Sequence, residues 1–107
     1  MSAGRAVESR RAAIGQALSR IAPKIPRHER ESVLDHALDS VGLARASPEM
    51  AAWLSLTAYI RHTFTEYEDL LAEGYDADSA RFFVRDHMNE VLEGWGSPRR
   101  IEAEDGE

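Results

Sequence analysis

Apolar residues recur at intervals of three and four positions through four long segments of this chain, and this spacing indicates α-helices that each bury one face. Prolines and glycines separate the segments, because proline cannot continue a helix and glycine favours its end. The helices are expected over residues 3–20, 27–41, 48–73 and 77–93. The sequence therefore predicts an all-α fold, a bundle of four helices in a single domain.

The domain is expected to occupy residues 1–96. Residues 97–107 are polar, and we expect them to form a disordered tail because they carry too few apolar side chains to bury.

Four helix boundaries carry specific chemical signals. Ser47 and Pro48 are a typical N-cap and first helical residue, and Asp76 can cap the last helix in the same way. Gly42 is expected to end the second helix in the left-handed conformation, and Gly74 to end the third.

The third helix is the longest and most apolar segment. Its expected core stripe is Met50, Trp53, Thr57, Ile60, Phe64, Tyr67 and Leu71. The opposite face of its first half is small and weakly polar, with Ala51, Ser55 and Ala58. A straight helix over 48–73 would be roughly 39 Å long, whereas a compact domain of this size has a radius of gyration of only about 13 Å. Either the bundle is elongated or this helix bends, and a bend is expected at the poor helix formers Thr63, Phe64 and Thr65.

The composition excludes several classes of site. The chain has no cysteine, which rules out disulfides, thiolate zinc sites, iron–sulfur clusters and cysteine nucleophiles. No apolar run approaches the roughly 18 residues that a membrane span needs, and the N-terminus lacks the apolar region of a secretory signal. We therefore expect a cytoplasmic protein that does not enter a membrane.

The histidines do not form a metal-binding pattern. A di-metal helical bundle uses Glu-x-x-His pairs, but the residues three positions before the four histidines are Ile25, Val33, Tyr59 and Val84. The chain also lacks a nucleophile motif and a glycine loop that could hold phosphate. We expect no metal and no cofactor, and the sequence favours a non-enzymatic role.

The candidate binding site is a quartet on the third helix: Arg61, His62, Thr65 and Glu68. At 100° per residue, His62 and Thr65 lie opposite the core stripe, while Arg61 and Glu68 share one flank. Such a group could bind a protein or a small anionic ligand. The alternative is a solvated helix face whose ion pairs contribute a few tenths of a kcal/mol each.

Charge is unevenly distributed along the chain. Residues 1–31 contain seven bases and three acids, whereas residues 32–107 contain six bases and sixteen acids. The basic first third offers a second hypothesis, nucleic-acid binding through Arg10, Arg11, Lys24 and Arg27, although the net charge of −6 opposes it. Attraction between this segment and the acidic remainder explains the same pattern without any partner.

Phe82 is expected to project away from the core stripe of the last helix, and an exposed aromatic residue can mark an interface. It could equally meet the first helix. The short heptad pattern of the first helix permits a weak homodimer as well as a monomer. Partner binding is therefore the function class that we favour, either as an interaction module or as a regulatory one.

The string Arg61-His62-x-x-Thr65-x-Tyr67-Glu68-x-Leu70-Leu71 resembles a family of short helical domains of bacteria and fungi, known only as a domain of unknown function. The resemblance extends from Pro23 to Trp95 and includes the Gly-Tyr-Asp string that precedes the last helix. It implies an all-helical fold and brings no activity with it.

Overall fold

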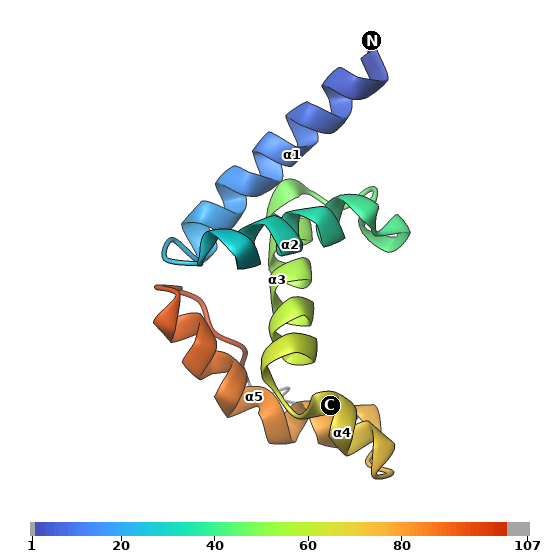
Figure 1. The fold of residues 1–107 in the computed structure, drawn as a ribbon, viewed down its shortest axis with the longest axis vertical. Coiled ribbons are helices and arrows are strands. Elements are labelled where there is room, and N and C mark those ends of the chain that lie inside the picture. Colours follow the sequence, from blue (N-terminus) through green and yellow to red (C-terminus); the bar gives the residue numbers. More distant parts are fainter. Residues whose placement is uncertain (1, 103–107) are drawn as a thin grey trace.

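The computed structural model describes residues 2–102 (Figure 1). This part of the chain forms five α-helices and one short 3-10 helix, with no strand. The helices are α1 (Ser2–Ile21), α2 (Arg27–Asp39), the 3-10 helix η1 (Val41–Leu43), α3 (Pro48–Phe64), α4 (Tyr67–Ala72) and α5 (Ala77–Gly94). The all-α prediction is confirmed.

The centre of the bundle is α3, which contacts α1, α2, α4 and α5. In Figure 1, α1 and α2 lie along its first half, while α4 and α5 lie at its other end. The molecule measures 47 × 28 × 27 Å, with a radius of gyration of 14.7 Å. It is therefore longer in one direction than in the other two, which is one of the two alternatives that the length of the third helical segment left open.

A single apolar core runs through the bundle and receives side chains from every α-helix. Its largest fully buried apolar side chains are Ile14, Leu18, Val33, Leu56, Ile60, Met88 and Leu92. Of these, Ile60 lies on the core stripe predicted for the third helical segment. The apolar residues Val7 in α1 and Val41 in η1 lie outside this core and are 56% and 90% exposed.

The buried face of α3 differs from the expected one. Ala51 and Ser55, expected on the outer face, are fully buried, whereas Met50 is 52% exposed. The Ser55 hydroxyl lies 3.4 Å from Nδ1 of His36 in α2. The reason is that α3 packs against several helices at once, and small side chains allow those helices to approach closely.

The prediction of four helices is wrong because the segment 48–73 forms two helices. Helix α3 ends at Phe64, and α4 begins at Tyr67. Between them Thr65 is extended, with φ −127° and ψ 172°. This break lies within the segment where a bend was predicted, and it turns α4 toward α5 rather than letting α3 run on.

Two of the predicted caps are confirmed in atomic detail. The Ser47 side chain accepts a hydrogen bond of 3.1 Å from the Met50 amide, and Asp76 accepts one of 2.8 Å from the Ser79 amide. The latter bond lowers the pKa of the Asp76 carboxyl, because it stabilises the charged form.

Of the two glycines predicted to end helices, only one does so. Gly74 ends α4 with φ +106°. The prediction for Gly42 is wrong: α2 already ends at Asp39, and Gly42 lies in η1 without a positive φ.

Residues 97–102 of the expected tail make defined contacts with the helices. The Asn89 side chain donates to the Ile101 carbonyl at 3.0 Å and accepts from the Ile101 amide at 2.7 Å. The Arg99 guanidinium lies 4.0 Å from the centre of the Trp53 ring. The rest of the expected tail, 103–107, lies outside the described residues.

Candidate functional site

The break between α3 and α4 brings the predicted quartet together. Arg61 and His62 lie in the last turn of α3, Thr65 follows it, and Glu68 lies in the first turn of α4. His62 Nδ1 pairs with Glu68 Oε2, and their side chains are 48% and 60% exposed. The pair is therefore accessible to a partner.

Thr65 connects the two helices through its hydroxyl group. The hydroxyl donates to the Arg61 carbonyl at 2.5 Å and accepts from the Tyr67 amide at 3.2 Å. One bond satisfies a carbonyl at the end of α3, and the other satisfies an amide at the start of α4, where helices leave such groups unpaired. The Thr65 side chain therefore joins α3 and α4 across the break.

Tyr67 is the buried centre around which the quartet is arranged. It is only 7% exposed, which confirms its predicted core position. The Arg61 guanidinium carbon lies 5.6 Å from the centre of its ring, and the His62 ring meets it edge-on at 5.4 Å. Arg61 and Thr65 thus have contacts within the chain that account for their positions, and His62 and Glu68 are the quartet's exposed members.

The basic residues of the second hypothesis are partly occupied by the fold. Arg10 donates to the carbonyls of Leu43 and Ala46, at 2.8 and 3.0 Å. Arg11 pairs with Asp35 and Glu31, and these hydrogen bonds raise the pKa of its guanidinium.

Lys24 and Arg27 are exposed and form no ion pair within residues 2–102. Two of the four cations thus make contacts within the protein, and one of these contacts, Arg11 with Asp35, joins the basic segment to the acidic remainder.

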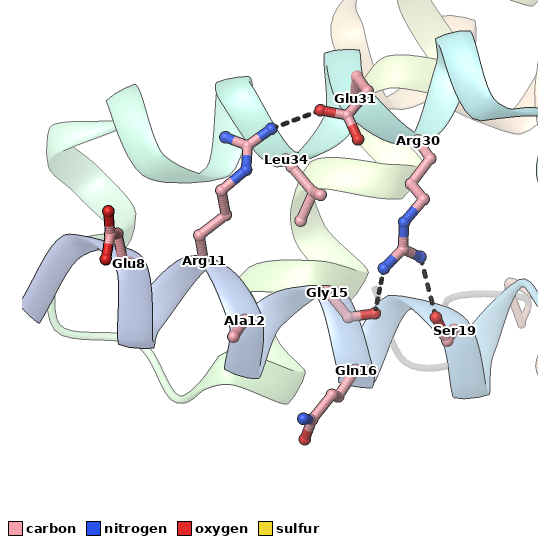
Figure 2. A pocket seen from close by; sticks show the side chains of 9 residues that line it. All are labelled: Glu8, Arg11, Ala12, Gly15, Gln16, Ser19, Arg30, Glu31 and Leu34. Atoms are coloured by element: carbon pink, nitrogen blue, oxygen red, sulfur yellow. Dashed lines mark hydrogen bonds and ion pairs between the residues drawn. The ribbon is translucent and has the colours of Figure 1, made fainter. Parts of the chain in front are cut away.

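A groove of about 590 Å³ lies between α1 and α2 (Figure 2). In Figure 2, Arg30 reaches from α2 to α1, where it donates to the Gly15 carbonyl and the Ser19 hydroxyl. A Cβ at Gly15 would lie only 3.0 Å from Arg30 Nη2, so glycine leaves room for this contact. The charges of two arginines and two glutamates balance in the groove, so it shows no preference for an anion. The residues that line it are Glu8, Arg11, Ala12, Gly15, Gln16, Ser19, Arg30, Glu31 and Leu34.

A group of exposed rings lies at the other end of the molecule. Tyr75, Phe82 and Phe83, here called the aromatic surface, are 44%, 63% and 55% exposed. The Phe83 ring centre lies 5.4 Å from that of Tyr75 and 5.8 Å from that of Phe82, both edge-on. Sequence reasoning singled out Phe82 alone. It did not single out Phe83 or Tyr75, and the Gly-Tyr-Asp string was the available indication of Tyr75.

The described residues contain no group of three or more histidine and carboxylate side chains placed to hold a metal ion. None of the helices in this part of the chain combines the length and the apolar character required to cross a membrane.

A comparison with models of protein families gives one match, over residues 17–96, to an uncharacterized conserved protein family, DUF2293. This confirms the resemblance to a family of unknown function. Comparisons with curated proteins and with solved structures gave no match. The quartet and the aromatic surface lie inside the matched segment, and Arg10 and Arg11 lie outside it.

Proposed function

This chain belongs to the DUF2293 family of uncharacterized conserved proteins, and we propose that it is a non-enzymatic interaction module that binds a protein partner. The observation that carries the proposal is the aromatic surface. Three contiguous aromatic side chains remain about half exposed although the bundle has a large apolar core. Single exposed apolar residues are ordinary, but a contiguous exposed group is typical of an interface.

The size of the aromatic surface indicates what it can contribute. About half of each ring side chain, on the order of 100 Å² apiece, would be removed from water by a partner. At about 25 cal/mol per Å², the three rings supply roughly 7 kcal/mol. Association itself costs about 4–15 kcal/mol. The rings can therefore anchor a partner, but polar contacts around them must add to the affinity.

The quartet has a defined place in this proposal. By fixing the break between α3 and α4, it sets the direction of α4, which leads through Gly74 to Tyr75 and so to the start of α5. His62 and Glu68 are the members of the quartet that a partner at this end of the molecule could also touch.

The test is capture of partners from a lysate of the source cells by immobilised full-length protein. We expect Phe82→Ala/Phe83→Ala to lose proteins that the wild type retains, while its melting temperature stays nearly unchanged because both rings are exposed. Met50→Ala is the matched control, because Met50 is 52% exposed at the start of α3. Equal capture by all three proteins would refute the proposal.

A further inference from the structure

We propose that the occupant of the aromatic surface is a basic segment of a partner protein, a helix that carries arginine or lysine beside apolar residues. This inference rests on the proposed function and names the chemistry of the partner. It follows from the charges that surround the three rings and from one contact that the chain already makes with them.

The aromatic surface continues along α5 into an acidic stripe, defined as Asp86, Glu90 and Glu93. Asp86 follows Phe82 and Phe83 by four and three positions, and Glu90 and Glu93 follow at further steps of four and three. Residues at these intervals share one face of an α-helix. All five are exposed, and the buried apolar residues of α5, Ala80, Val84, Met88 and Leu92, lie on the opposite side of the helix. The buried Asn89 lies at the edge of this face, where it bonds Ile101. One outward face of α5 therefore presents rings at one end and carboxylates at the other.

The surroundings of this face are strongly acidic. Residues 66–94 contain nine carboxylates, all exposed, against two arginines, a formal charge of −7. Arg81 already pairs with Asp78, and Arg85 lies 3.9 Å from Asp86. Glu90 and Glu93 form no ion pair within residues 2–102. The unbalanced charge attracts a cationic partner and repels an acidic peptide or a nucleic acid.

The chain itself shows that these rings accept a cation. The Arg85 guanidinium lies over the Phe82 ring, 5.4 Å from its centre. An arginine from a partner could make the same contact with Phe83 or Tyr75, whose rings are about half exposed. Arginine and lysine also have long apolar stems that cover hydrophobic surface while the charge reaches a carboxylate. A basic, partly apolar helix thus fits both halves of the face.

The experiment measures the affinity of the full chain for labelled synthetic peptides by fluorescence anisotropy. The probe is a leucine–arginine amphipathic helix of about 18 residues, long enough to form in isolation. One matched peptide replaces arginine with glutamate, and another replaces leucine with serine. We expect the first probe to bind most tightly and to weaken at high salt.

Two variants test where the probe binds. Asp86→Asn/Glu90→Gln/Glu93→Gln should weaken it by about tenfold through the loss of three charge contacts, and Phe82→Ala/Phe83→Ala should weaken it as well. The control Glu8→Gln/Asp39→Asn/Glu49→Gln removes the same charge from exposed positions in α1, α2 and the first turn of α3, and should bind like the wild type.

The inference is overturned if the glutamate or serine peptide binds equally well, or if the control weakens binding as much as the acidic-stripe variant. Self-association of the wild type that Phe83→Ala abolishes would also overturn it, because a second copy would then be the occupant. If the peptide measurements contradict the inference while Phe82→Ala/Phe83→Ala still loses captured proteins, the proposed function stands. Only the basic chemistry inferred for the partner is then wrong.

Discussion

Thr65 explains at the scale of one residue why the third helical segment breaks. A threonine is a poor helix former, and its hydroxyl can compete for backbone groups that a helix would otherwise use. Here it bonds the Arg61 carbonyl and the Tyr67 amide, one from each side of the break. The sequence indicated the weak point, but the bonding partners depend on the path that the chain takes after it.

Replacing Thr65 with valine keeps the shape of the side chain and removes both hydrogen bonds. We expect a loss of about 1 kcal/mol in the free energy of unfolding, which corresponds to a fall of roughly 4–8 °C in melting temperature. Thermal unfolding followed by circular dichroism measures it. Thr65→Ser retains the hydroxyl and should lose much less. A valine variant as stable as the wild type would show that these bonds do not hold the break.

At the scale of whole elements, the predicted helix caps follow from local chemistry with one exception. Ser47 and Asp76 cap their helices as predicted, because an N-cap needs only its own side chain and an amide three residues away. Gly42 failed as a prediction because α2 ends three residues earlier and the chain continues into η1. A glycine permits the left-handed conformation, but the neighbouring structure decides whether it is used.

Two glycines that differ in backbone conformation form a matched test of the turn between α4 and α5. Gly74 has φ +106°, whereas Gly94 is the last residue of helix α5, and a Cβ at either would meet no atom within 4 Å. We expect Gly74→Ala to destabilise the protein by about 1–2 kcal/mol and Gly94→Ala to stabilise it by up to about 1 kcal/mol. Urea unfolding of both variants measures the difference, and shifts of the same sign would contradict this explanation.

At the scale of the whole molecule, the segment after α5 is held by contacts that no local pattern indicates. Asn89 is 6% exposed and uses both ends of its amide on Ile101. Arg99 lies over Trp53, a residue of α3 far from it in the sequence. Composition marks this segment as polar, but it does not indicate these two contacts, which join the segment to α5 and α3.

We expect Asn89→Ala to release this segment and to lower the melting temperature by a few degrees, since two bonds to a half-buried backbone are lost. The specific readout is hydrogen exchange at the Ile101 amide, which should lose its protection, together with a change in Trp53 fluorescence. Arg99→Ala is the control, because it should alter the fluorescence and leave the Ile101 amide protected. An Ile101 amide that stays protected in Asn89→Ala would contradict the assignment.

The candidate site, like the helices, could be predicted only in part from the sequence. On an unbroken helix, His62 and Glu68 would point in different directions, about 120° apart, and Glu68 would share a flank with Arg61 instead. The break turns Glu68 to His62. Phe83 of α5 is 55% exposed, which the sequence did not indicate.

The sequence by itself determined the all-helical class, the positions of the helices, most of their ends and the weak point in the third segment. These features depend on hydrogen bonds and side-chain spacing within a few residues of each other. The tertiary structure alone decided which face of α3 is buried, which members of the quartet meet and which aromatic rings remain exposed. Burial depends on which other elements arrive at a surface, and that information is distributed over the whole chain.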